Sequence, residues 1–223
     1  GAIIGAAAGG GVGPALAGVL IASVSLSAPF AVNAASYIVI IAALVMWRNK
    51  SQAVSTSQPV FSAMLTGARH VAFNGPLKAT LVRAFAFFVF ASAYWALLPL
   101  VVQGIEGGDA TLYGLLLTLI GTGAVVGART LPKFRAKFDA GTTVMAGTFG
   151  TALAMAVLAT AVTPVLAYFA ALLGGFSWIA VLTTLNVSAQ TALPNWVRAR
   201  GLAINLMVFF GAMAFGSAFW GQV

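Results

Sequence analysis

The sequence predicts an all-α fold, a polytopic integral membrane bundle of about seven transmembrane helices. Composition is the first reason, because 61% of the residues are apolar, only 6% are charged and the mean hydropathy is +1.03. A chain with so few charges has no polar coat for a water-soluble globule. The second reason is that about seven apolar runs reach the roughly 20 residues a helix needs to cross a bilayer. These runs do not alternate apolar and polar residues as the strands of a transmembrane barrel do, so the pattern favours helices over strands.

The predicted spans, in chain order, are Ala2–Ile21, Ala28–Trp47, Ala79–Gln103, Thr111–Ala128, Thr143–Val162, Val165–Thr184 and Ala203–Val223. The first run lacks the charged start and the cleavage site of a secretory signal peptide, so we expect a membrane helix there. It is apolar from its first residue, and the last run is still apolar at its end. Both ends are therefore expected to belong to a longer membrane protein, and a complete protein is the alternative.

A stripe of small residues marks the first span. Gly5, Gly9, Gly13 and Ala17 recur every four residues. In lipid this spacing lets two helices pack with their backbones close together, whereas in water each glycine would cost a helix about 1 kcal/mol. Pro14 removes one backbone hydrogen bond within the stripe and allows a bend. We expect this face to pack on another helix, either at an interface between moving bundles or as ordinary close packing.

The one long loop covers residues 48–78. Its first part, residues 51–59, is polar and Ser-rich and ends in Pro59, which predicts a flexible linker. Apolar residues at helical spacing follow in 60–71, and they predict a helix lying along the membrane surface. The loop divides the chain into two spans in residues 1–47 and five spans in residues 79–223.

The basic residues predict the orientation in the membrane. Lys and Arg occur after the second, fourth and sixth runs, and the other three loops between runs hold none. Because cytoplasmic loops carry the excess of Lys and Arg, Gly1 is predicted on the cytoplasmic side and Val223 on the far side. The same distribution explains the net charge of +8 without a nucleic-acid partner. Arg83 lies just inside the third run and is expected to snorkel to the surface.

Few residues could support catalysis or metal binding. The chain has no cysteine, one histidine, His70, and three acidic residues. A zinc or iron site needs several such ligands close together, and a nucleophilic triad needs a histidine held by a carboxylate. His70 lies in a basic loop with no acid nearby in the sequence. We therefore expect no catalytic residue, no metal, no cofactor and no enzymatic activity.

Four stretches resemble the major facilitator superfamily. The stretch Gly9-x3-Gly13-Pro14-x2-Ala17-Gly18 is similar to the antiporter motif of the superfamily's fifth helix, with Ala17 in place of a glycine. The second resemblance, to the approach to the seventh helix and to that helix, lies in residues 65–71 and 75–77, in Arg83 and in residues 90–99. Residues 123–135 occupy the place of the basic loop motif in the second half, but lack its Asp. Residues 194–201, followed by three spaced glycines, are the most specific match. The branch they resemble is bacterial and includes enterobactin-type exporters and transmembrane secretion effectors.

The resemblance implies a partial major facilitator fold that matches the fifth to eleventh helices. Residues 1–47 would hold the last two helices of the N-terminal bundle, and residues 48–78 the cytoplasmic loop between bundles. Residues 79–223 would hold the first five helices of the C-terminal bundle. Four helices would then precede this sequence and one would follow it.

The implied function is secondary-active export of small amphipathic molecules, such as siderophores, drugs or metabolites, by alternating access. The implied setting is the bacterial inner membrane, with a monomer as the full-length protein. Protons are the candidate coupling ion; no acid lies inside any run, so the coupling carboxylate would lie in helices outside this sequence. A transport-inactive membrane sensor or scaffold is the alternative. A membrane enzyme would require catalytic residues from outside this sequence.

The resemblance also implies three groups of site residues. The bundle-interface motif comprises Gly5, Gly9, Gly13, Pro14, Ala17, Gly18, Gly211, Gly216 and Gly221. The candidates for the substrate cavity are Tyr94, Trp95, Trp178, Asn186 and Gln190. Contacts between helices, or aromatic side chains at the membrane interface, are the alternative roles for these five. The candidates for the cytoplasmic gate are Arg129, Lys133, Arg135, Arg198 and Arg200. Signals that set the topology are the alternative role for the basic residues.

Overall fold

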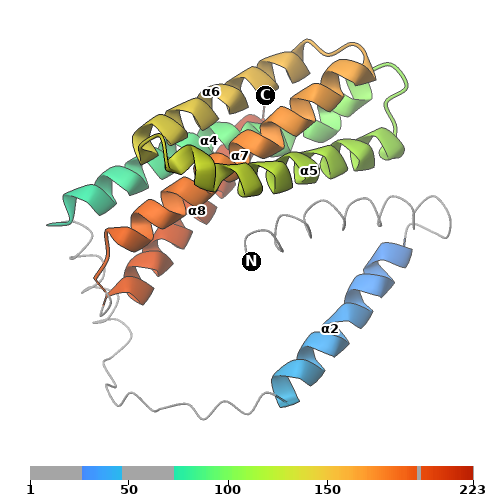
Figure 1. Ribbon diagram of the computed structural model, residues 1–223. Helices are drawn as coiled ribbons and strands as arrows, with labels where there is room; N and C mark the ends of the chain where they lie inside the picture. The colour runs from blue at the N-terminus through green and yellow to red at the C-terminus, as the bar shows by residue number, and fades with distance from the viewer. Residues whose placement is uncertain (1–26, 47–72, 195–196, 223) are drawn as a thin grey trace.

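The computed structural model describes residues 27–46, 73–194 and 197–222, and this part of the chain is all-helical. Its helices are α2 (Ala28–Met46), α4 (Gly75–Gly104), α5 (Ala110–Arg135), α6 (Ala140–Ala159), α7 (Pro164–Thr191) and α8 (Arg198–Trp220) (Figure 1). The predicted all-α membrane bundle is therefore confirmed. The first predicted span, the glycine stripe within it and the predicted surface helix lie outside the described residues.

Five of these helices, α4 to α8, are long and apolar enough to cross a membrane. They coincide with the last five predicted spans. The second predicted span corresponds to α2, whose apolar segment Phe30–Met46 is shorter. Within the described residues, α2 packs against none of the other five helices, and its large apolar side chains are exposed. Apolar exposure on this scale fits contact with lipid rather than with water.

Helices α4, α5 and α7 extend beyond their predicted runs at both ends, whereas α6 and α8 begin before their runs and end three residues earlier, at Ala159 and Trp220. Helix α4 begins at Gly75 and not at Ala79, since Asn74 caps it by accepting a hydrogen bond of 3.0 Å from the backbone N–H of Leu77. Most of the basic residues after the fourth and sixth runs, expected in loops, are helical, and Lys137 lies in the turn after α5. Those in the last turn of α5, Lys133 and Arg135, lie where the helix dipole favours positive charge.

Two aspartates outside the spans cap the next helices. The Asp109 carboxylate accepts a hydrogen bond of 2.8 Å from the backbone N–H of Leu112, which lowers the pKa of Asp109. The Asp139 carboxylate accepts hydrogen bonds from the Thr142 hydroxyl and from the backbone N–H groups of Gly141 and Thr142, and these bonds lower the pKa of Asp139. Both carboxylates satisfy backbone donors that a helix start leaves open.

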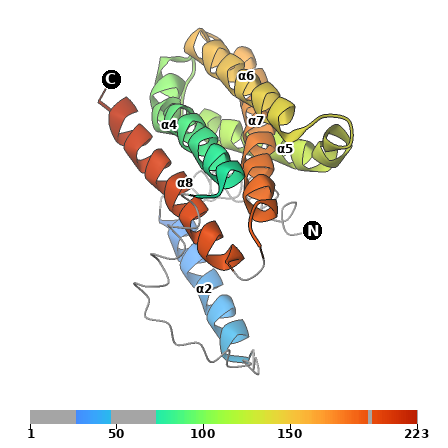
Figure 2. The same ribbon diagram turned by 90° about the vertical axis from the view of Figure 1, so that its left-hand side faces the viewer.

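Helix α7 packs between α5 and α6, and α4 packs mainly against α8 (Figures 1 and 2). Glycines make the α7 contacts close. A Cβ atom added to Gly123 on α5 would lie 2.1 Å from the carbonyl oxygen of Leu172, and one added to Gly175 on α7 would lie 1.9 Å from that of Ile120. On α6, a Cβ atom at Gly150 would lie 2.2 Å from the Ser177 hydroxyl. Small residues thus let these helices touch through their backbones.

The contact between α4 and α8 uses one glycine and two hydrogen bonds. A Cβ atom at Gly216 would lie 2.4 Å from the carbonyl oxygen of Val89. That oxygen accepts hydrogen bonds from the Ser92 hydroxyl at 2.7 Å and from the indole N–H of Trp220 at 3.0 Å. Asn74 adds a link at the other end of α4, because its side-chain amide donates a hydrogen bond of 2.9 Å to the carbonyl oxygen of Ala192, just after α7. Helix α4 is thereby held to both α7 and α8.

Candidate functional site

Aromatic side chains from three helices, α4, α7 and α8, lie in contact with one another. Trp95 on α4 and Trp178 on α7 lie with ring centroids 5.6 Å apart and an interplanar angle of 79°. Phe88, seven residues before Trp95 on the same face of α4, lies 5.4 Å from Trp178 and 4.5 Å from Phe209 on α8. Tyr94 lies 5.9 Å from Trp95. We call Phe88, Tyr94, Trp95, Trp178 and Phe209 the aromatic cluster.

Three of the five predicted cavity residues, Tyr94, Trp95 and Trp178, are therefore brought together. Phe88 and Phe209 were missed, because one phenylalanine in an apolar run has the same pattern whether it faces lipid or protein. The seven-residue spacing from Phe88 to Trp95 was the available signal. Edge-to-face contacts of this kind add stability beyond the area they bury.

Two donors in the aromatic cluster have no hydrogen-bond partner among the described residues. They are the hydroxyl of Tyr94 and the indole N–H of Trp95, and both atoms are buried. Tyr94 is only 5% exposed, and its hydroxyl lies over Gly174 on α7, where an added Cβ atom would approach it to 2.6 Å. A buried donor without a partner costs about 1–3 kcal/mol. Such groups in native structures call for an explanation, and a bound acceptor is one.

The remaining two cavity candidates lie elsewhere along α7. Asn186 is about 12 Å beyond Trp178 along the helix axis, and Gln190 about 18 Å. The Nδ2 atom of Asn205 on α8 donates a hydrogen bond of 2.9 Å to Oδ1 of Asn186, and Asn205 is itself buried. Asn186 therefore joins α7 to α8, in keeping with the alternative role of contacts between helices. The Gln190 side chain is exposed.

The gate candidates have different surroundings. The Nη2 atom of Arg135, at the end of α5, donates a hydrogen bond of 2.8 Å to the hydroxyl of Thr184 and one of 3.5 Å to the hydroxyl of Thr183. Both threonines are buried on α7. In the part of the chain that the structure describes, the partners of Arg135 are these hydroxyls and no carboxylate. Arg198 donates 3.4 Å to the carbonyl of Leu193, and the side chains of Arg129 and Lys133 are exposed. Arg200 is partly buried in the first turn of α8.

The second half of the predicted glycine motif does not form one packed stripe in the described residues. Gly216 packs against α4, whereas a Cβ atom at Gly211 would meet nothing within 4 Å. At Gly221 it would meet only the carbonyl oxygen of Ser217, one turn earlier on the same helix, at 3.0 Å. A spacing of five residues turns each glycine away from the previous one, which is why only one of them reaches the neighbouring helix.

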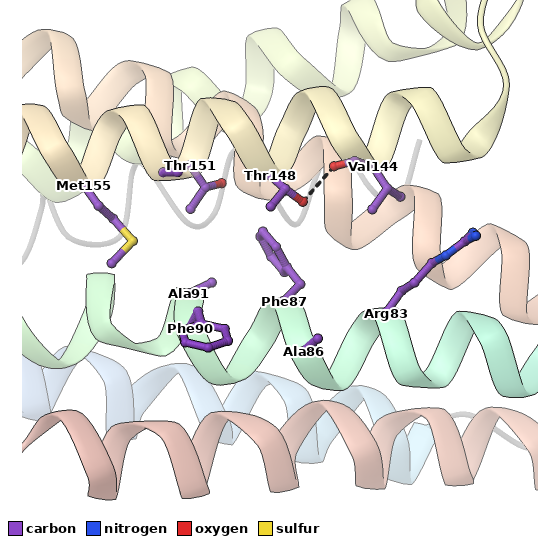
Figure 3. A pocket seen from close by; sticks show the side chains of 10 residues that line it. Arg83, Ala86, Phe87, Phe90, Ala91, Val144, Thr148, Thr151 and Met155 are labelled. Atoms are coloured by element: carbon purple, nitrogen blue, oxygen red, sulfur yellow. Dashed lines mark hydrogen bonds between the residues drawn. The ribbon is translucent and has the colours of Figure 1, made fainter.

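A groove of about 390 Å³ lies between α4 and α6, beside the aromatic cluster (Figure 3). It was not predicted, and none of the five cavity candidates lines it. The lining residues are Arg83, Ala86, Phe87, Phe90, Ala91, Val144, Thr148, Thr151, Ala152 and Met155. Phe87 connects the two features, because it lines the groove and its ring centroid lies 6.1 Å from that of Trp178.

Comparison with known proteins agrees with the helical bundle. A protein-family model described as transmembrane secretion effector, within the major facilitator superfamily, matches residues 4–223. No curated protein and no solved structure matches the chain. The match covers nearly all of the sequence and includes every described helix. The chain thus belongs to the transmembrane secretion effector family of the major facilitator superfamily, and is a multi-pass membrane protein of a transporter family.

Proposed function

We propose that this protein is a secondary-active exporter of small amphipathic molecules, and that the aromatic cluster forms part of its substrate site. The unpartnered hydroxyl of Tyr94 and indole N–H of Trp95 carry the proposal. They are hydrogen-bond donors set among apolar rings, and ligand sites commonly combine an apolar lining with a few placed polar groups. A substrate with an aromatic or apolar body and an acceptor oxygen would satisfy both features.

The surrounding bundle supports alternating access. In alternating access one bundle rocks against the other, and the glycine contacts of α7 with α5 and α6 hold the C-terminal bundle together as one unit. In this proposal residues 1–47 belong to the N-terminal bundle, residues 48–78 connect the bundles, and residues 79–223 belong to the C-terminal bundle. The cluster would then face the cavity between the bundles. Arg129, Lys133, Arg135, Arg198 and Arg200 would act at its cytoplasmic gate.

Coupling to protons completes the proposal. The three acidic residues of the chain, Glu106, Asp109 and Asp139, all lie outside the described membrane helices. A carboxylate that carries protons across the membrane would therefore come from helices outside this sequence. The bacterial branch that the sequence resembles supports export from the cytoplasm across the inner membrane as the setting.

The test is transport by the full-length carrier in everted membrane vesicles, with two aromatic probes that carry acceptor oxygens, rhodamine 6G and an alkoxy-substituted bis-benzimide dye. Tyr94→Phe and Trp95→Phe each remove one donor and keep a ring. We expect each to raise the KM for at least one probe about tenfold, the change that one lost hydrogen bond gives. Tyr168→Phe is the matched control, because Tyr168 is partly buried on α7 outside the cluster.

Unchanged kinetics in both donor variants would remove the aromatic cluster from the substrate site. If the wild-type carrier is inserted in the membrane but moves neither probe, with or without a proton gradient, the result would favour the alternative function of a transport-inactive sensor or scaffold.

A further inference from the structure

The groove between α4 and α6 has an almost wholly apolar lining. Its two polar side chains apart from Arg83 are Thr148 and Thr151, and their hydroxyls donate to carbonyls of their own helix, Val144 at 2.8 Å and Gly147 at 2.9 Å. Both hydroxyl protons are therefore already used within α6, and Figure 3 marks the bond from Thr148 to Val144. What the groove offers an occupant along its length is methyl groups, rings and the Met155 thioether.

One charge stands at the end of this apolar groove. Arg83 lies eight residues from the start of α4, about 12 Å along the helix axis. Its side chain is exposed, and among the described residues it has no hydrogen-bond or ion-pair partner. A guanidinium within a membrane span is costly unless it reaches an anion or water. An elongated apolar groove with a cation at one end is complementary to an amphiphile with an anionic head and a hydrocarbon tail.

The walls of the groove suit a flexible chain better than another helix. The α5–α7, α6–α7 and α4–α8 contacts each include a glycine that brings backbones together. No glycine lines the groove, and its walls carry the bulkier Phe87, Phe90 and Met155. A helix packed on these side chains would lie farther from α4 and α6 than in the glycine contacts, whereas an acyl chain can bend around them.

We propose that the groove binds an anionic phospholipid, with the phosphate on Arg83 and one acyl chain between α4 and α6. In the orientation predicted from the basic loops, Arg83 lies in the cytoplasmic half of the membrane. Anionic lipids are attracted there by basic residues, and basic pockets between membrane helices bind their headgroups. Because Phe87 lines the groove and contacts Trp178, the lipid would pack directly behind the aromatic cluster.

The test is native mass spectrometry of the purified full-length protein, released from vesicles of phosphatidylcholine with or without phosphatidylglycerol. We expect wild type and Arg83→Lys to retain phosphatidylglycerol in preference to phosphatidylcholine. Arg83→Gln is expected to retain at least about tenfold less, as for loss of a charge-assisted hydrogen bond. Ala152→Phe, which fills the groove and leaves the charge, is expected to lower retention of both lipids. Arg129→Gln is the matched control, because Arg129 is an exposed arginine outside the groove.

Three results would overturn the proposal. If the wild-type protein retains no lipid, another helix covers the groove. If it forms a lipid-free dimer, a second copy of the chain covers the groove. Equal retention by wild type, Arg83→Gln and Ala152→Phe would place the bound lipid elsewhere. Dye transport and lipid retention are separate readouts, so failure of the aromatic substrate site leaves this test intact.

Discussion

Asn205 on α8 donates a hydrogen bond of 2.9 Å to the Asn186 side chain on α7. The pair lies about 12 Å along α7 from Trp178, so it connects two helices without joining the aromatic cluster. An amide in the membrane needs a partner, and here each amide is the partner of the other. The contribution of this polar contact can therefore be measured by substituting Asn186 and Asn205 singly and together.

Replacing one amide of this pair should cost more than replacing both. Asn186→Leu leaves the buried amide of Asn205 without its partner, at roughly 1–3 kcal/mol, and Asn205→Leu leaves the partly buried amide of Asn186 without its partner, at a smaller cost. The double variant removes both polar groups and should recover part of that loss. A double-mutant cycle on melting temperatures in detergent measures the coupling, which averages about 0.6 kcal/mol for polar pairs in membranes. Additive losses would mean that the hydrogen bond contributes nothing, and a raised KM in Asn186→Leu would return this residue to the substrate site.

The glycines between α5 and α7 should tolerate no larger side chain. In Gly123→Ala or Gly175→Ala the new methyl would overlap a backbone carbonyl at 2.1 or 1.9 Å, so the helices must separate. We expect a loss of about 1–3 kcal/mol, or roughly 2–4 °C in melting temperature per kcal/mol. Gly211→Ala is the control, because its methyl meets open space. It should be neutral or stabilising through helix propensity, and equal losses at all three positions would contradict the packing explanation.

Arg135 should hold the end of α5 against α7 through Thr184. In Arg135→Gln the long donor is lost, and we expect the ends of the two helices to separate more often. The chain has no cysteine, so a single cysteine at Leu131, a buried position on α5, reports this directly. Its reaction with a thiol reagent should become several-fold faster in Arg135→Gln. With Arg129→Gln as the control, equal rates in both variants would refute the role of Arg135.

Stability should fall in acid because two helix caps become protonated. The pKa of Asp109 is lowered mainly by the backbone N–H of Leu112, and that of Asp139 mainly by the Thr142 hydroxyl. A carboxyl with a lowered pKa in the folded state contributes its full stability above its unfolded pKa of about 3.9. That contribution is lost as pH falls through the lower folded value.

Melting temperatures measured from pH 6 to pH 3 should therefore decline below about pH 4. The double variant Asp109→Asn and Asp139→Asn retains an acceptor at each cap and does not titrate. Its melting curve should depend less on pH over this range. An unchanged pH dependence in that variant would assign the acid sensitivity to other groups.

The sequence by itself determined the class of the protein and the place of its helices. Apolar runs of membrane length located α4 to α8, since each such segment must satisfy its backbone hydrogen bonds internally in lipid. Helix ends were less predictable: Asn74 starts α4 before the apolar run begins, because a cap depends on a local hydrogen bond and not on hydropathy. Trp95 and Trp178 were both predicted as site residues, but the sequence did not predict that their rings are in contact.

Only the tertiary structure decided which face of each helix meets which neighbour. In these helices apolar residues surround the axis, so no amphipathic stripe distinguishes protein from lipid. Asn205 as the partner of Asn186, Phe88 in the aromatic cluster and Thr184 beside Arg135 all depend on the rotation of each helix about its axis. That rotation is set by where glycines allow backbones to approach, and the groove beside Arg83 lies where no glycine closes the space.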